Sequence, residues 1–260
     1  MRVTLLGTGD SAGVPHIGCG CETCSRYQEE GRERTRFSLL IENQGERVLV
    51  DASPDLRTQF LREDVSSVDH LLLTHAHYDH YAGLGNLYRV VWDDLPVYGV
   101  PSVLEYVVEE RYGYLPFTEP RSVEPHEPFE VAGLEFIMLP VHHPPSECYG
   151  FVVRDGDTKL AVTCDTSTAI PQASKTEMRE ADLLVADAFL SSEADVDYPG
   201  FVEQKISDDG RDFADKHMTE EGALALADEL DAEETVLVHL SHYFRDDDPP
   251  KADDGDVFEL

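Results

Sequence analysis

The segment His75-Ala76-His77-Tyr78-Asp79-His80 constrains the fold of this chain more than any other. It follows the apolar run His70–Thr74, which is typical of a buried strand in a layered α/β protein. A strand that ends in His-x-His-x-Asp-His delivers three imidazoles and one carboxylate to one edge of its sheet. These groups are suitable ligands for zinc, manganese or iron. A solvated His-rich loop is the alternative, but such a loop would not need the preceding strand.

His-x-His-x-Asp-His is similar to the central motif of the metallo-β-lactamase superfamily. The resemblance implies that the first two histidines hold one metal, that the Asp-His pair holds a second, and that later strand ends supply further ligands. Polar residues follow apolar, β-branched runs at three later places. These are His142 and His143 after Leu139-Pro140-Val141, Asp165 after Leu160–Cys164, and His239 after Thr235–Val238.

The resemblance implies a ligand set divided over two divalent metals, zinc or manganese. One metal would be held by His75, His77, His143 and Asp165, and the other by Asp79, His80, Asp165 and His239. Asp165 would bridge the two. His142 is the alternative to His143, which is preferred because its distance to Gly150 is closer to the family spacing.

A second motif lies near the N-terminus, where three of the five cysteines form C-x-C-x-x-C with Cys19, Cys21 and Cys24. Thiolates at this spacing can share one tetrahedral metal, and zinc is the usual occupant of such a structural site. His242, which follows the predicted ligand His239 in His239-Leu240-Ser241-His242, is the expected fourth ligand. Disulfide bonding is the alternative, but three cysteines cannot all pair with one another.

The two motifs together resemble the PhnP-type phosphodiesterases, accessory enzymes of carbon–phosphorus lyase pathways. The likeness also includes Leu5–Gly9, Gly13-Val14-Pro15, Leu49-Val50-Asp51, Pro96–Gly99 and the closing His239–His242. It therefore extends over nearly the whole chain and implies hydrolysis of small phosphodiesters, including cyclic ones. A related protein of pyrroloquinoline quinone biosynthesis carries a similar cysteine cluster but departs from His-x-His-x-Asp-His. The complete motif in this chain favours a working hydrolase.

The resemblance also implies a general-acid role for His217. Asp79 is expected to act in catalysis as well as in metal binding. A departing alkoxide needs a proton, and histidine titrates near neutral pH. His217 precedes a helix that Thr219 is predicted to cap, so an inert surface histidine is the alternative. Asp51 matches a superfamily aspartate that orients a metal-bound histidine, and a turn-forming role is its alternative.

The expected activity is metal-dependent phosphodiester hydrolysis by a dinuclear-metal hydroxide mechanism, with metals roughly 3.5–4 Å apart. Three alternatives remain. A tRNA 3′-processing nuclease normally carries a flexible basic arm, and no such segment is evident in the sequence. A thioester or β-lactam hydrolase would have no need of the cysteine cluster. A non-catalytic metal-binding protein would not need the complete ligand set.

The amino-acid composition is strongly acidic, which bears on the solvent and on the substrates that the predicted site can accept. Lys and Arg number 20 against 53 Asp and Glu, which gives a net charge of -33 with the acids spread along the chain. At about 1 M salt the Debye length falls to roughly 3 Å and self-repulsion is screened, which indicates a halophilic protein in a high-salt cytoplasm. The scarcity of basic residues disfavours an extended nucleic-acid surface. A small anionic phosphodiester would then depend on the metals and on Arg36 or Arg89, and a homodimer is a further option.

The length of 260 residues suits one α/β domain with a four-layer αββα metallo-β-lactamase fold. The hydrolase domain is expected over residues 1–245, with a Cys-rich zinc-binding insertion at about 12–36 and a loosely held acidic tail at 246–260. Residues 191–209 are predicted to form a polar loop near the site. No signal peptide or run of about 20 apolar residues is evident, so a membrane partner is not expected. Helices are predicted at 55–63, 101–112 and 171–180, and strands at 3–7, 38–42, 47–51, 70–74, 134–140, 148–154, 159–164, 183–186 and 235–238.

Overall fold

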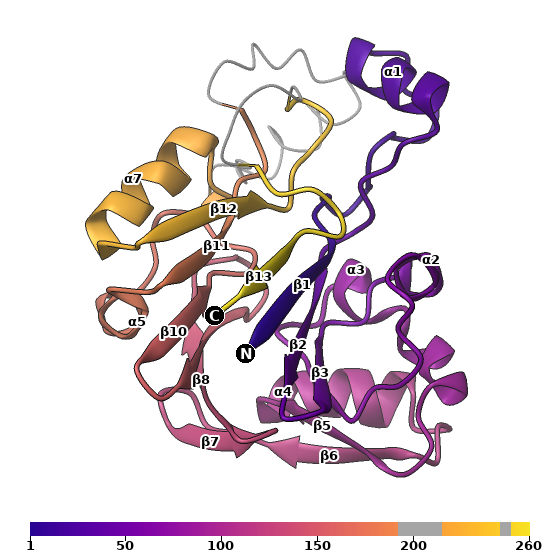
Figure 1. Cartoon of the computed structure of the whole chain (residues 1–260), viewed down its shortest axis with the longest axis vertical. Helices are drawn as coiled ribbons and strands as arrows, with labels where there is room; N and C mark the ends of the chain where they lie inside the picture. Colours follow the sequence, from indigo (N-terminus) through magenta and orange to yellow (C-terminus); the bar gives the residue numbers. More distant parts are fainter. Residues whose placement is uncertain (192–214, 245–250) are drawn as a thin grey trace.

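The computed structural model describes residues 1–191, 215–244 and 251–260. Two β-sheets pack against each other, and helices cover the outer face of each sheet (Figure 1). The predicted loop at 191–209 lies, apart from its first residue, outside the described residues. Each helix in the described ranges is too short or too polar to cross a membrane.

The first sheet has seven strands in the order β13-β1-β2-β3-β4-β5-β6. Strands β13, β1, β2 and β3 pair in antiparallel fashion, whereas β3, β4, β5 and β6 run parallel. The strands are β1 (Arg2–Gly7), β2 (Ser38–Asn43), β3 (Glu46–Val50), β4 (His70–Leu72), β5 (Leu95–Gly99), β6 (Thr118–Ser122) and β13 (Val257–Glu259).

The second sheet has six strands in the order β12-β11-β10-β9-β8-β7. Strands β7 to β10 form an antiparallel meander, and β10, β11 and β12 run parallel. The strands are β7 (Pro128–Val131), β8 (Leu134–Pro140), β9 (Tyr149–Asp155), β10 (Thr158–Val162), β11 (Leu183–Asp187) and β12 (Glu234–Val238).

Helices on the two outer faces complete the layers. The first sheet is covered by α2 (Leu56–Arg62) and by α4 (Pro101–Leu104), which continues as the π-helical segment η2 (Glu105–Arg111). The second sheet is covered by α5 (Gln172–Met178) and α7 (Glu220–Leu230). Two short helices, α3 (Tyr78–Tyr81) and the 3-10 helix η1 (Leu84–Arg89), follow β4, and α1 (Glu22–Glu30) lies apart from both sheets (Figure 1).

The alternation of side chains along the strands explains these layers. On β2, Leu39 and Ile41 point into the core between the sheets, whereas Leu40 points outward and joins the cluster that contains Phe60 of α2. On the other side, Leu226 of α7 belongs to a third cluster against the second sheet. Three apolar layers therefore separate four layers of secondary structure, and the predicted αββα fold is confirmed.

The C-terminal residues contradict the expected loose tail over the part that is described, 251–260. β13 pairs with β1, and the Asp254 carboxylate accepts hydrogen bonds from the backbone N–H groups of Thr8 at 2.8 Å and Thr35 at 2.7 Å. The same carboxylate lies 3.1 Å from Nη1 of Arg62. Composition suggested a solvated tail, but this aspartate satisfies backbone donors that need a partner when buried.

Candidate metal centre

The carboxyl ends of six strands meet at one edge, where the two sheets face each other. β3 and β4 run parallel in the first sheet, and β8, β10, β11 and β12 share one direction in the second. A bridge between His75 and Cys148 joins the two sheets at this edge. The residues that follow these strands are Asp51 after β3, His75 after β4, His143 after β8, Asp165 after β10, Asp187 at the end of β11 and His239 after β12.

Three of these strand ends turn through a left-handed residue. The φ angles are 56° at Asp51, 50° at Cys164 and 59° at His239. Such a conformation costs a non-glycine residue on the order of 1–3 kcal/mol, and surrounding contacts must hold it in place. The sharp turns end the strands abruptly and leave polar side chains at the rim. Three of the nine non-glycine residues with positive φ in the described ranges therefore lie at the candidate site.

The first ligand cluster contains the four residues predicted for one metal, His75, His77, His143 and Asp165, with ligand atoms within 4.8 Å of one another. Nε2 of His143 lies 3.2 Å from Nδ1 of His77, and Nε2 of His75 lies 3.7 Å from Oδ2 of Asp165. Tetrahedral coordination with metal bonds of roughly 2.0–2.2 Å requires ligand atoms to be roughly 3.3–3.6 Å apart. The observed spacing is close to this value.

His142 does not take part in this cluster. Its backbone N–H donates to Thr166 Oγ1 at 3.0 Å, and its Nδ1 lies 2.9 Å from Ser167 Oγ. His143, by contrast, is buried against His77. The structure therefore places His143, the preferred candidate, in the position of a ligand.

The second ligand cluster contains Asp79, His80, Asp165 and His239. Oδ2 of Asp165 lies 3.4 Å from Nε2 of His80 and 3.4 Å from Nε2 of His239. Oδ2 of Asp79 lies 3.3 Å and 3.7 Å from the same two nitrogens. Asp165 belongs to both clusters, as the predicted bridging role requires.

Buried imidazole nitrogens without a hydrogen-bond partner indicate whether these clusters can hold cations. Nε2 of His75, His80 and His239 are buried without a hydrogen-bond partner among the described residues. A buried, unsatisfied polar atom costs about 1–3 kcal/mol, so these lone pairs need a partner. Each lies within 4 Å of Asp165 Oδ2. A divalent cation between imidazole and carboxylate would satisfy both, so the residues fit a metal.

The electrostatics of the site favour a cation as well. Burial and the nearby His80 hold the pKa of His75 well below its ordinary value. Burial opposes protonation of His80, but the carboxylates of Asp165 and Asp79 outweigh it and raise the pKa of His80 well above its ordinary value. The negative potential that retains this proton would also attract a divalent cation.

The second nitrogen of His75, His77, His80 and His143 has its own close partner, which fixes the ring and its tautomer. The Asp51 carboxylate is buried and also accepts from Thr74 N–H at 2.9 Å and Thr74 Oγ1 at 2.7 Å. The close pairs are His75 Nδ1 with Thr74 Oγ1 at 3.1 Å, His77 Nε2 with Ser146 Oγ at 2.7 Å, His80 Nδ1 with Asp51 Oδ2 at 2.6 Å, and His143 Nδ1 with Lys216 O at 2.9 Å. Asp51 thus contacts a ligand histidine in the way that the resemblance implied.

Asp187 is a buried residue of the site that the sequence analysis missed. Its Oδ1 lies 3.4 Å from Nδ1 of His239, and its Oδ2 lies 3.2 Å from Nδ1 of His217. It also accepts from the Met218 backbone N–H at 3.0 Å. It ends an apolar strand, as Asp165 follows one, so the same signal could have identified it.

His217 lies beside the two ligand clusters and belongs to neither. Its ring stacks on His239 with centroids 4.8 Å apart and planes at 12°, and its centroid is also 4.8 Å from that of His143. The predicted helix cap is confirmed, because Thr219 Oγ1 accepts from Gly222 N–H at 3.1 Å at the start of α7. The chain thus holds His217 at the rim of the site.

The cysteine motif and His242 form a separate cluster, as predicted. Nδ1 of His242 lies 3.4 Å from Sγ of Cys19, 3.6 Å from Sγ of Cys21 and 3.3 Å from Sγ of Cys24. Zinc with bonds of about 2.3 Å to sulfur and 2.0–2.1 Å to nitrogen would place these atoms roughly 3.5 Å apart in a tetrahedron. Burial raises the pKa of Cys24 to about 12, so its thiol stays protonated unless a cation replaces the proton.

The two arginines expected to assist an anionic substrate have other surroundings. Arg36 Nη1 lies 2.8 Å from Asp55 Oδ1, so its charge is paired. Arg89 lines a pocket between α2 and η1 that shares no residue with the ligand clusters. Neither arginine therefore contacts the described residues of the two ligand clusters.

Comparisons with known proteins agree with this geometry. The sequence profile of the β-lactamase superfamily domain matches residues 46–240. The crystal structure of a diphosphatase from the PhnP family is 30% identical, with a TM-score of 0.81 over 100% of this chain and 98% of that chain. A ribonuclease Z from Bradyrhizobium diazoefficiens is 24% identical over 95% of this chain and 91% of that protein. An octanoyltransferase from Porphyromonas gingivalis is 32% identical over 94% of this chain, but the chain spans only 46% of that protein.

Proposed function

The chain belongs to the metallo-β-lactamase superfamily and is a metal-dependent hydrolase, and we propose that its substrates are small phosphodiesters. The whole-length likeness to a diphosphatase of the PhnP family supports a phosphorus centre as the site of attack. The octanoyltransferase carries no argument for activity, because the chain covers less than half of that protein. We further propose two divalent catalytic metals and one structural zinc.

The observation that carries this proposal is the position of His217. A phosphodiesterase needs a proton donor near the departing oxygen, in addition to the groups that hold metals. His217 lies against the rings of His143 and His239, one from each ligand cluster, while Asp187 fixes its Nδ1. His217 also forms a close group of possible ligands with Asp187 and His239, but a protein that only held metal in the two ligand clusters would not need this oriented histidine beside them.

Each group of residues at the site has a separate role in the proposed reaction. When bound, the two divalent ions supply stabilisation of charge on the phosphoryl oxygens and activation of a water nucleophile. Asp165 and Asp79 would hold the ions, while Asp51 and Ser146 orient His80 and His77. The Asp187 carboxylate lies 3.2 Å from Nδ1 of His217, and Nε2 is the atom we assign to protonation of the departing alkoxide.

Turnover of bis(p-nitrophenyl) phosphate by protein loaded with manganese or zinc in high salt tests the proposal. The wild-type protein is expected to release p-nitrophenolate, and Asp165→Ala is expected to abolish release because this carboxylate serves both clusters. Asp155→Ala is a matched control, since Asp155 contacts the N-terminal amine rather than the site. Absence of turnover with either metal, in protein shown to contain it, would rule out the proposed activity.

Two alternative substrate classes are distinguished by a second kinetic comparison. The likeness to a diphosphatase favours a diphosphate diester, in which a phosphoanhydride bond is broken, as a second candidate. The ribonuclease Z relative suggests precursor tRNA, although a chain with 53 acidic and 20 basic residues is poorly suited to a long polyanion. Comparing kcat/KM for a cyclic phosphodiester, a dinucleoside diphosphate and a precursor tRNA ranks the three.

A further inference from the structure

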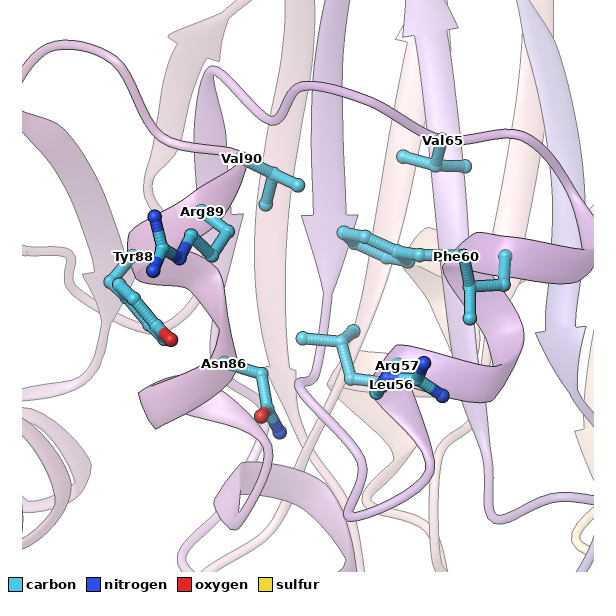
Figure 2. A pocket seen from close by; sticks show the side chains of 9 residues that line it. Leu56, Arg57, Phe60, Val65, Asn86, Tyr88, Arg89 and Val90 are labelled. Carbon is cyan, nitrogen blue, oxygen red and sulfur yellow. The ribbon is translucent and has the colours of Figure 1, made fainter.

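A pocket of about 300 Å³ opens between α2 and η1, on the outer side of the first sheet. Figure 2 shows Leu56 and Phe60 of α2 on one side, Tyr88 and Arg89 of η1 on the other, and Val65 and Val90 toward one end. Leu56, Phe60 and Val65 are buried and give the pocket an apolar floor. None of its lining residues belongs to a ligand cluster.

Two arginines stand at this pocket, Arg57 from α2 and Arg89 from η1. Several other arginines that the structure describes, such as Arg36 and Arg154, are paired with carboxylates. Arg57 and Arg89 have no carboxylate partner among the described residues, although the chain carries 53 acids. The Arg89 guanidinium lies 4.8 Å from the centroid of the Tyr88 ring, a contact that restricts where its charge can lie.

The lining thus combines an apolar floor with positive charge and two neutral hydrogen-bonding groups, the Asn86 amide and the Tyr88 hydroxyl. Small-molecule sites in proteins have this composition, in which apolar walls bury the body of a ligand and a few polar groups fix its orientation. The volume is at the lower end of the range for such sites, roughly 300–1,000 Å³, and admits a body of about two or three rings.

We propose that this pocket binds a small aromatic anion, with its ring system on Leu56, Phe60 and Val65 and its anionic group at the pocket rim, where the exposed Arg57 and Arg89 side chains lie. A negative ligand is favoured because these two cations lack local counter-charges in a chain of net charge -33. Inorganic anions alone would leave the apolar floor unused, and neutral aromatic compounds would leave the arginines unpaired. This ligand site is separate from the hydrolase centre and does not depend on the proposed substrate.

Titration with the fluorescent aryl sulfonate 8-anilinonaphthalene-1-sulfonate tests this inference. The wild-type protein is expected to bind one equivalent, and R57Q/R89Q is expected to bind it at least about tenfold more weakly because two charge-assisted contacts are lost. R179Q is the matched control, since Arg179 is exposed, forms no ion pair with a carboxylate among the described residues and lies on the opposite side of the fold, after α5. Its affinity should stay within twofold of wild type.

A neutral analogue, N-phenyl-1-naphthylamine, separates charge from burial. It should bind R57Q/R89Q and wild type equally, and more weakly than the sulfonate binds wild type. Equal sulfonate affinity in R57Q/R89Q and wild type would overturn the site, as would an equal loss in R179Q. The arginines are exposed, so the variants should fold, and unchanged hydrolysis of bis(p-nitrophenyl) phosphate would show that the metal centre is intact.

Discussion

Replacement of His217 by alanine separates proton donation from metal binding. The ring lies outside both ligand clusters, so His217→Ala should retain the catalytic metals. It should lower kcat for a substrate with a poor leaving group by about 10²–10⁴-fold, the usual contribution of general acid–base catalysis. That range corresponds to about 3–5 kcal/mol of transition-state stabilisation. The upper part is expected here because Asp187 holds the ring in one orientation, with Nδ1 3.2 Å from its carboxylate.

The assay compares an alkyl phosphodiester with bis(p-nitrophenyl) phosphate at fixed metal content. A p-nitrophenolate leaves with little protonation, so its rate should fall much less than that of the alkyl substrate. Asp187→Asn should produce a smaller loss with the same dependence on the leaving group, because the ring remains but loses the carboxylate that orients it. Equal losses on both substrates, or loss of metal from His217→Ala, would refute general-acid catalysis by this residue.

Four further outcomes are expected. Cys21→Ser should remove one zinc per chain by elemental analysis and lower the melting temperature, whereas Cys148→Ser, outside the cluster, should keep that zinc. Because the pKa of Cys24 is raised to about 12, protons compete with zinc for this thiol, so zinc affinity measured by chelator competition should fall as pH falls. Asp51→Asn should weaken metal binding by about 10–100-fold through the loss of its contact with His80, while Asp55→Asn, which contacts Arg36, should leave metal affinity unchanged. The melting temperature should rise steeply between low salt and about 1 M KCl as self-repulsion is screened, and a flat profile would contradict the interpretation of the -33 charge.

The clustering of the candidate ligands could be predicted because these residues follow a repeated local pattern. Asp165 and His239 each come directly after an apolar run, and parallel strands bring such ends to one edge. The contacts around the ligands have no equally distinct pattern. Ser146 lies in a Pro-rich turn and contacts His77 only because β8 and β9 place that turn over the site. Its role depends on tertiary structure, which local sequence does not encode.

The strands that the sequence analysis missed share a different property. β5, β6 and β7 contain Pro96, Pro120 and Pro128, and proline within a run argues against a strand because it cannot donate to a ladder. β6 and β7 lie at the edges of their sheets, where a missing donor is tolerated. The prediction for the C-terminal segment was wrong because its many aspartates are typical of a solvated tail. In the structure, the Asp254 carboxylate accepts hydrogen bonds from two backbone N–H groups instead.

The cysteine cluster and the metal centre share one short segment, which links the stability of one to the geometry of the other. His239 belongs to the second ligand cluster and His242 to the cysteine cluster. Between them, Leu240 N–H donates to Thr8 O at 2.9 Å, and Asp10 N–H donates to Leu240 O at 3.1 Å. A zinc held by Cys19, Cys21, Cys24 and His242 would therefore fasten the N-terminal insertion to the segment that presents His239. Helix α1 of this insertion lies apart from both sheets in Figure 1, and its buried residues are Cys24 and Tyr27. The His16 ring already stacks on His242 with centroids 3.9 Å apart, and a zinc would add direct bonds to this contact.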